Sequence, residues 1–308
     1  MSPRNCVVMI GVLIVFLAAC VYGFLLDTNL DPCSRDFGFF TGYSINCIAK
    51  ALHSIPVFNL TGYTNVCFNV LSLSNNYLTV IGNDAFIQLR NPGCSYHIGL
   101  NNNSISQIDE YAFRGIEANI IGLYLHKNSL NHLPEAISSI IYLRQLTLYE
   151  NPLLSLNPSV MAKIGHSLDE FSVGMASFKQ WPTELHFLYK LTDLELYDIP
   201  FQFLDSSAFR GLTNVTSLAI MGSNFRKIPN AICTLSALSS LQIDNNYLLN
   251  ESKSDVFEPC SHISGTLHVT RIDYRSNRVD FFPKHFYNVS SCRSHLYGPQ
   301  RYAVHECR

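Results

Sequence analysis

The chain has 308 residues, with 21 basic and 23 acidic side chains and a formal net charge of −2 when histidine is neutral. Charged residues make up 14% of the sequence, well below the roughly 25% of ordinary soluble domains. This balance provides no overall attraction to nucleic acid or to acidic lipid, so we expect no nucleic-acid partner.

The chain begins with a segment typical of a secretory signal peptide. Arg4 precedes a nearly unbroken apolar run over residues 6–22, and small residues stand before a cleavage point ahead of Phe24. We therefore assign residues 1–23 to a leader that is removed. The alternatives are an uncleaved anchor, for which the run is shorter than the about 20 apolar residues of a spanning helix, and a lipid-modified Cys20. No second long apolar stretch follows, so we expect the mature chain to be secreted and to have no membrane span.

A pattern of the form Leu-x-x-Leu-x-Leu-x-x-Asn-x-Leu recurs along most of the chain. It is clearest at Ile120, Leu123, Leu125, Asn128 and Leu130. Nine copies are legible, 23 to 31 residues apart, and their first apolar positions are Phe68, Ser95, Ile120, Leu143, Leu168, Leu191, Val215, Leu238 and Val269. Such a pattern and period are the signature of leucine-rich repeats, in which each copy forms one coil of a solenoid.

The array, which we assign to residues 67–291, is expected to be an α/β solenoid: a horseshoe with a parallel β-sheet on its concave side. In each coil the alternating apolar side chains of a short strand point into the core, and the following Asn bonds backbone groups of adjoining turns. This ladder of Asn side chains comprises Asn76, Asn103, Asn128, Asn151, Asn246 and Asn277, and is interrupted at Ala176, Ile199 and Ser223. We expect the three interrupted coils to be less regular or more deformable.

The repeats resemble those of animal extracellular leucine-rich repeat proteins, among them chaoptin, Slit and the ectodomains of Toll-type receptors. The resemblance is carried by segments such as 100–105 (LNNNSI) and 112–115 (AFRG), and it covers about residues 45–290. It identifies the superfamily and no particular member. It implies a role in extracellular recognition or adhesion.

The same resemblance implies a cap over residues 24–66, before the array. Ile45, Cys47 and Leu52, followed by the pair at 55–56, match the pattern of N-terminal caps in this superfamily. Those caps normally contain four clustered cysteines, whereas here only Cys33 and Cys47 are present, and their pairing with each other is the simplest arrangement. A short flank over residues 292–308 is expected to close the other end.

Eight cysteines remain beyond the leader, an even number that predicts disulfides in an oxidising compartment. Cys67 and Cys94 directly precede the first positions of consecutive repeats, which sets them on adjacent strands about 5 Å apart and within bridging distance. Local pairing is also expected for Cys233 with Cys260, and for Cys292 with Cys307. Zinc binding is the alternative, although the sequence contains no Cys-x-x-Cys pair.

The sequence contains no motif of a known catalytic or nucleotide-binding class. Nucleophile elbows, phosphate-binding loops, His-Glu-x-x-His segments and dinucleotide fingerprints are all missing. The 11 histidines are scattered without a repeated metal-ligand spacing. We therefore expect a protein that is not an enzyme and that needs no cofactor or metal.

The variable residues between and just after the strand leucines are expected to face outward on the concave side. They provide ten candidate ligand-binding residues: Tyr124, His126, Tyr149, Glu150, Asp169, Glu170, Asp193, Glu195, Tyr197 and Asp198. Tyrosine is favoured at protein interfaces, and grouped carboxylates steer a basic partner. We interpret this set as a site for an extracellular protein with a basic surface. An ordinary solvated face is the alternative.

Five Asn-x-Ser/Thr triplets are candidate glycosylation sites: Asn59, Asn102, Asn214, Asn250 and Asn288. A glycan on Asn102 would obstruct the first two repeats and shift recognition toward the centre of the array. The sequence thus predicts a secreted recognition module, such as a soluble receptor, ligand or adhesion factor. A structural component of the extracellular matrix and the soluble portion of a membrane receptor are the alternatives.

Overall fold

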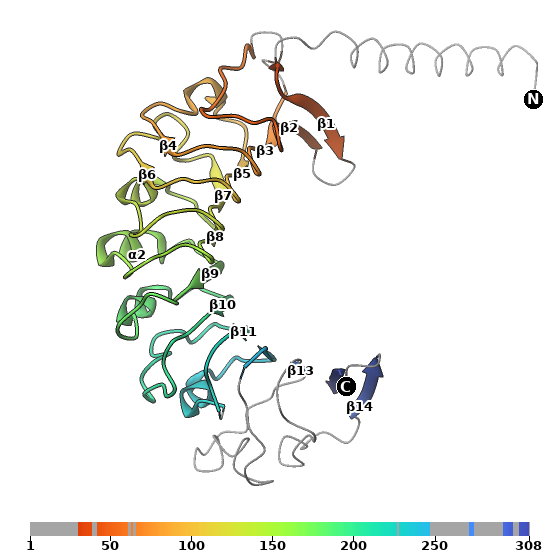
Figure 1. The fold of residues 1–308 in the computed structure, drawn as a ribbon, viewed down its shortest axis with the longest axis vertical. Helices are drawn as coiled ribbons and strands as arrows, with labels where there is room; N and C mark the ends of the chain where they lie inside the picture. Colours follow the sequence, from red (N-terminus) through yellow and green to blue (C-terminus); the bar gives the residue numbers. More distant parts are fainter. Residues whose placement is uncertain are drawn as a thin grey trace, which may run out of the picture.

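The protein forms an arc of stacked coils, with strands on the inner, concave side and short helical turns on the outer side (Figure 1). The computed structural model describes residues 30–38, 42–60, 63, 66–226, 228–246, 271–273, 292–297 and 302–307. The predicted leader, Asn250, Cys260, Asn277 and Asn288 lie outside the described residues. The predicted leucine-rich repeat solenoid with a concave sheet is confirmed.

The concave side of the described chain is one sheet of thirteen strands. Ten of these run parallel to one another in chain order: β2 (Gly42–Asn46), β3 (Phe68–Ser72), β5 (Tyr96–Gly99), β7 (Ile120–Tyr124), β8 (Gln145–Thr147), β9 (Glu170–Gly174), β10 (Asp193–Tyr197), β11 (Ser217–Met221), β12 (Ser240–Asp244) and β13 (Arg271–Asp273). The nine from β3 to β13 correspond to the nine predicted repeats, and β2 adds one strand before them.

Antiparallel strands complete both ends of this sheet. At the N-terminal end, β1 (Ser34–Gly38) pairs with β2. At the other end, β15 (Tyr302–Cys307) pairs with both β13 and β14 (Cys292–Tyr297). These pairings give the first and last repeats a neighbouring strand, so their backbone groups find partners beyond the repeat array.

The outer side of the coils carries short elements. They are β4 (Val80–Ile81) and β6 (Gln107–Ile108), which pair as a small parallel sheet, η3 (Ile87–Leu89), η4 (Glu135–Ser139), α2 (Pro158–Ile164), η5 (Thr183–Phe187) and η6 (Asn230–Thr234). The α2 helix begins where Oδ1 of Asn157 accepts hydrogen bonds from the backbone N–H groups of Ser159 and Val160. Within the described chain, no helix has the length and apolarity needed to cross a bilayer.

Strand alternation separates the core from the concave surface. In β10, Leu194 and Leu196 are fully buried, whereas Asp193, Glu195 and Tyr197 are partly exposed. The same alternation recurs in β12. Because successive side chains of a strand point to opposite faces, the leucines build the core and the residues between them form the concave face.

The Asn ladder bonds each coil to the preceding one. Asn128 illustrates it: Nδ2 donates to the carbonyl oxygens of Leu125, in its own coil, and Leu100, one coil back, at 2.9 and 3.0 Å. Oδ1 of Asn128 accepts a hydrogen bond from the Ile105 N–H at 2.9 Å. Asn76, Asn103 and Asn151 make equivalent bonds, so the predicted ladder is confirmed there.

The strands of the coils lacking this Asn are as regular as the others, so of the two expectations the lower regularity is not found, while greater deformability remains a prediction. Strands β9, β10 and β11 pair residue for residue, and register shifts occur only nearer the N-terminus, at β2–β3 and β5–β7, among the described pairings. Two substitutes explain the regularity. Ile199 and Met175 are fully buried and fill the turns with apolar packing, and Oγ of Ser223 accepts a hydrogen bond from the Ile199 N–H at 3.0 Å.

Two disulfides lie near the N-terminal end, and they join the pairs expected from the sequence. Cys33 and Cys47 have Cα atoms 4.4 Å apart, and those of Cys67 and Cys94 are 5.3 Å apart. Cys233 is also disulfide-bonded, while its expected partner lies outside the described residues. Strand register sets the last two cysteines, Cys292 and Cys307, directly opposite each other, and their bridge remains a prediction.

Candidate functional site

Outward side chains of the central strands form three rows across β8 to β12, which we call the concave rows. Parallel pairing without register shifts sets each residue beside its counterpart on the next strand. The first row is Gln145, Glu170, Asp193, Ser217 and Ser240; the second is Thr147, Ser172, Glu195, Ala219 and Gln242; the third is Tyr149, Gly174, Tyr197, Met221 and Asp244. The rows bring together residues from five repeats.

Three of the predicted residues form a continuous ring stack, which we call the aromatic stack. The rings of His126 and Tyr149 lie with centroids 4.4 Å apart at 11°, and those of Tyr149 and Tyr197 lie 4.5 Å apart at 22°. Nδ1 of His126 is also 2.9 Å from Oγ1 of Thr147. The stack therefore runs from the coil of β7 to that of β10. Thr147 contacts it at the His126 end and Glu195 at the Tyr197 end.

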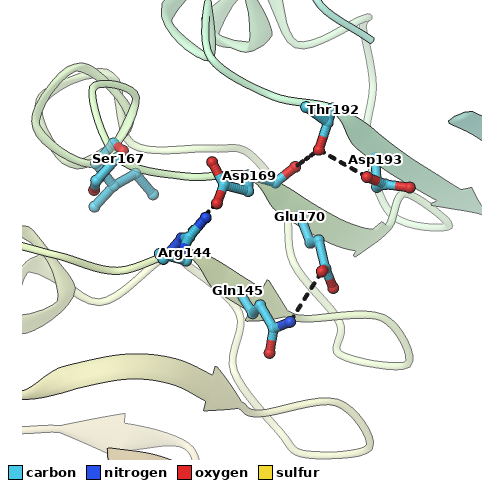
Figure 2. Close-up of polar contacts among 8 residues, drawn as sticks. Arg144, Gln145, Ser167, Asp169, Glu170, Thr192 and Asp193 are labelled. Atoms are coloured by element: carbon cyan, nitrogen blue, oxygen red, sulfur yellow. Dashed lines mark hydrogen bonds and ion pairs between the residues drawn. The ribbon is translucent and has the colours of Figure 1, made fainter. Parts of the chain in front are cut away.

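Tyr124 belongs to a separate chain of hydrogen bonds along the first row. Its hydroxyl donates to Oε1 of Gln145 at 2.5 Å and lies 3.0 Å from Nδ1 of His97. Nε2 of Gln145 then donates to Oε1 of Glu170 at 2.9 Å (Figure 2). Gly122 leaves the space for this contact, since a Cβ there would lie 2.3 Å from Nδ1 of His97.

Neutral donors hold the carboxylates of β10. Oε2 of Glu195 accepts hydrogen bonds from Oγ of Ser172 at 2.7 Å and from the Tyr197 hydroxyl at 3.2 Å. Oδ2 of Asp193 accepts a hydrogen bond from Oγ1 of Thr192 at 2.7 Å (Figure 2). Such bonds fix the position of each carboxylate without cancelling its charge.

Glu150 and Asp198 directly follow the outer tyrosines of the stack. Both have left-handed backbone, with φ of 54°, and both are exposed. Glu150 forms an ion pair with Lys127, Oε1 to Nζ 3.6 Å, while burial and the charge of Glu150 raise the pKa of the Asp198 carboxyl. Asp198 thus lies in a field that is already negative.

The ionisable rings of the stack are neutral near pH 7. Burial, followed by the charge of Glu195, raises the pKa of Tyr197 far above its usual 10.0. Burial and the charge of Lys127 lower the pKa of His126 below its usual 6.5. The charge of this surface therefore comes from its carboxylates.

The ionisable side chains at these concave positions are all acidic. The concave rows and the two residues that follow the tyrosines contain six carboxylates: Glu150, Glu170, Asp193, Glu195, Asp198 and Asp244. The same positions contain no Lys, Arg or His. Across the whole described chain, no group of three or more His, Cys, Asp or Glu side chains is arranged to hold a metal ion.

Asp169 precedes β9 (Glu170–Gly174) and is not a member of the concave rows. Its Oδ2 is 2.5 Å from Nε of Arg144, at the start of the strand and away from Glu170 (Figure 2). The backbone N–H groups of Asp169 and Glu170 both donate to the Arg144 carbonyl oxygen, each at 2.8 Å. This double donation interrupts the strand alternation at Asp169, whose carboxylate is engaged by Arg144, and a ligand contact of Asp169 remains a prediction.

Sequence reasoning missed several members of the concave rows. Asp244 occupies in repeat eight the position that Tyr149 and Tyr197 occupy in repeats four and six, so strand position could have found it. Gln145 and Ser172 are uncharged, and only their contacts with Tyr124 and Glu195 show their role. The candidate glycosylation residues Asn59, Asn102 and Asn214 are exposed, and Asn102 follows β5 and bonds the side chain of Asn75.

Comparison with known proteins supports the fold and leaves the role open. No family model and no curated protein matches the sequence. Human 5T4, also named Wnt-activated inhibitory factor 1 or trophoblast glycoprotein, aligns at 20% identity over 76% of this chain and 77% of its own, with a TM-score of 0.47. A leucine-rich repeat protein of Leptospira interrogans aligns at 22% identity over 77% of this chain and 55% of its own, with a TM-score of 0.51.

The chain therefore has the leucine-rich repeat fold, on the evidence of its own repeats and of the structural likeness to the bacterial protein. Proteins with such solenoids typically use their extended concave surfaces to bind other proteins. The chain spans about half the length of the bacterial relative, 55%.

Proposed function

We propose that the chain is a secreted glycoprotein that recognises an extracellular protein through its concave face. The observation that carries this proposal is the aromatic stack of His126, Tyr149 and Tyr197, set on a regular parallel sheet among carboxylates. Rings that are already held in place lose little conformational freedom when a partner covers them, and tyrosine supplies a large contact area at low entropic cost.

The shape of the surface favours a protein over a small molecule. The concave rows extend over five strands, from β8 to β12. A pocket of about 510 Å³ lies instead beside the cap, where Phe58, Tyr63 and Tyr96 are among its lining residues, and none of the stack residues lines it. Small ligands are normally enclosed in pockets, whereas protein partners cover broad surfaces.

Three features support a secreted glycoprotein. The first residues have the pattern of a signal peptide. Disulfides such as Cys33–Cys47 and Cys67–Cys94 persist in oxidising compartments. Asn59 and Asn214 stand in glycosylation triplets and are exposed. Carboxylates around the stack favour a partner with a basic surface.

An extracellular interactome screen with the full glycosylated protein tests the proposal. We expect a protein partner whose affinity falls at least about tenfold, or about 1.4 kcal/mol, in the double variant Tyr149→Ala, Tyr197→Ala. The matched control is Tyr142→Ala with Tyr189→Ala, since these tyrosines are 58% and 49% exposed and lie outside the concave rows.

Two results would overturn the proposal. One is a partner that binds the Tyr149→Ala, Tyr197→Ala variant as tightly as the natural protein while the variant remains folded. The other is the lack of any partner together with concentration-dependent self-association in small-angle scattering, which would favour a structural component of the matrix.

A further inference from the structure

We propose that Tyr149 and Tyr197 form a site of oxidative cross-linking, where a haem peroxidase acting with hydrogen peroxide joins the two stacked rings by a carbon–carbon bond. The product is a dityrosine that links the coil of β8 to the coil of β10. This chemistry goes beyond protein recognition and does not depend on it. Three features carry the proposal: the distance between the rings, their orientation on the sheet, and a proton acceptor beside one phenol.

The two rings approach each other more closely than the strands that carry them. Strands two places apart in a sheet are separated by about 10 Å, yet the ring centroids of Tyr149 and Tyr197 are 4.5 Å apart. Gly174 lies on the strand between them and has no side chain, and a Cβ there would lie 3.3 Å from Cα of Tyr149. The rings therefore lean toward each other over β9 and are in direct contact.

Both rings leave the sheet in the same direction. Tyr149 and Tyr197 occupy the third concave row, and equivalent residues of parallel strands project to the same face. The ring planes differ by 22°, so the hydroxyl-bearing ends of the rings lie on the same side of the stack. A phenoxyl radical couples through the carbon next to its C–O carbon, which is Cε of tyrosine. The stack therefore brings the reactive carbons of the two rings together before any oxidant acts.

Glu195 provides the proton acceptor that oxidation of Tyr197 requires. A phenol that loses one electron also releases its proton, and the Tyr197 hydroxyl donates to Oε2 of Glu195 at 3.2 Å, which is within reach of proton transfer. Oγ of Ser172 donates to the same oxygen at 2.7 Å and fixes its position. Burial and the charge of Glu195 raise the pKa of Tyr197 above its usual 10.0, so the phenol is neutral until the electron leaves.

The reaction balances with one molecule of hydrogen peroxide. Each phenol gives one electron to the peroxidase and one proton, from Tyr197 to Glu195 and from the partly exposed Tyr149 to water. The two radicals form a bond between one Cε of each ring. The hydrogens on those carbons then move to the oxygens and restore both phenols. The two electrons and two protons that are released convert the peroxide to two molecules of water.

Tryptic mapping of the full glycosylated protein identifies the bond. Peptides 145–163 and 191–210 each contain a single tyrosine, Tyr149 and Tyr197 respectively. After treatment with a haem peroxidase and equimolar hydrogen peroxide, we expect these two peptides to be joined with the loss of two hydrogens and to show dityrosine fluorescence. The fraction joined should not change on dilution, because the link is intramolecular, whereas links between molecules decrease.

Two other tyrosines of the same chain are internal controls. Tyr142 and Tyr189 are 58% and 49% exposed, more than either stacked tyrosine, and neither makes a ring contact within the described chain. Peptides 128–144 and 180–190 contain one tyrosine each and should be cross-linked at least about tenfold less than the stacked pair. Free tyrosine in a parallel sample checks that the oxidant is active.

Four variants separate the contributions of the phenol, the proton acceptor and the glycine. Tyr197→Phe keeps a ring in the stack and should abolish the link, and Gly174→Leu should abolish it by separating the rings. Glu195→Gln keeps both phenols and should slow the link at least about fivefold. Its matched control is Asp193→Asn, which removes the same charge from the same strand and should change the rate less than about twofold. Melting curves check that each variant is folded.

Three results would overturn the proposal. One is active oxidant that leaves peptides 145–163 and 191–210 unjoined. Another is cross-linking of Tyr142 or Tyr189 as extensive as that of the stacked pair. The third is a link that forms at the full rate in folded Gly174→Leu. The proposed function fails separately, because it concerns a protein partner and its test includes no oxidant.

Discussion

Tyr149 and Tyr197 stack at 4.5 Å between ring centroids, although a whole strand, β9, separates the coils that carry them. Gly174 occupies the equivalent position of β9 and has no side chain to stand between the rings. A Cβ at Gly174 would lie 3.1 Å from the backbone N of Glu150 and 3.3 Å from Cα of Tyr149. The stack therefore depends on the lack of a side chain as much as on the two tyrosines.

Substitution of Gly174 tests this dependence. Gly174→Leu should separate the rings and lower the free energy of unfolding by about 1–3 kcal/mol, since the new side chain has no free volume. Near-ultraviolet circular dichroism should lose the signal of the coupled tyrosines, and chemical denaturation measures the stability. The control is Gly82→Ala, because nothing lies within 4 Å of a Cβ built there. An unchanged tyrosine signal in Gly174→Leu would contradict the role of the glycine.

Much of the fold could be predicted because the same apolar pattern recurs in each repeat. Leu194 and Leu196 follow the alternation that Leu123 and Leu125 follow three coils earlier, and all four are buried. A pattern that recurs in phase fixes which side of each strand faces the core. The concave location of Tyr149, Glu195 and Tyr197 follows from that alternation.

What the sequence could not show depends on contacts between coils. Asp169 departs from the alternation because its backbone N–H and that of Glu170 both donate to the Arg144 carbonyl oxygen. The residue types at these positions do not predict that arrangement. The stack is equally hidden, because it joins residues 48 positions apart across a glycine. The Ser223 hydroxyl accepts the bond that an Asn side chain accepts in other coils. The repeat pattern alone shows only that the consensus Asn is missing there.

The Asn ladder predicts unequal costs for two deletions of a polar side chain. Asn151→Ala removes a hydrogen bond accepted from the buried Leu130 N–H at 3.0 Å and two bonds donated to the carbonyl oxygens of Leu125 and Leu148. We expect a loss of about 2–3 kcal/mol in the free energy of unfolding. Ser223→Ala removes one bond accepted from the Ile199 N–H and one donated to the Met221 carbonyl oxygen at 3.2 Å, and should cost about 1–2 kcal/mol. Urea denaturation measures both, and a larger loss for Ser223→Ala would refute this account of the ladder.

Asp198 should destabilise the folded protein at neutral pH. Burial and Glu150 raise the pKa of its carboxyl above the usual 3.8, so the folded state holds this proton more tightly than the unfolded state does. Stability then falls as the pH rises from the unfolded to the folded pKa, and the cost persists above that range. Asp198→Asn should raise the melting temperature at pH 7, and the gain should vanish near pH 3. Asparagine also suits the left-handed backbone, as at Asn75 and Asn245.

A carboxyl with the opposite shift provides the control. Hydrogen bonds from the side chain and the backbone N–H of Ser207 lower the pKa of Asp205. Its ionised form therefore stabilises the fold above the unfolded pKa, and this contribution is lost as the pH falls through the folded pKa. Asp205→Asn should lower the melting temperature at pH 7, with no difference in strong acid. If both variants shift in the same direction at pH 7, the pKa argument for Asp198 fails.

Protonation of His126 should weaken the fold on the acidic side of neutrality. Burial, with a smaller effect of Lys127, lowers the pKa of His126 below 6.5, while Glu150 acts in the opposite direction. The stabilising contribution of the neutral ring is complete above about pH 6.5 and decreases as the pH falls toward the lower folded pKa, because the unfolded chain takes up the proton first. Titration of the ring by NMR should give a pKa below 6.5, which Lys127→Ala raises and Glu150→Gln lowers. A pKa that responds to neither substitution would mean that His126 does not sense the charges beside the stack.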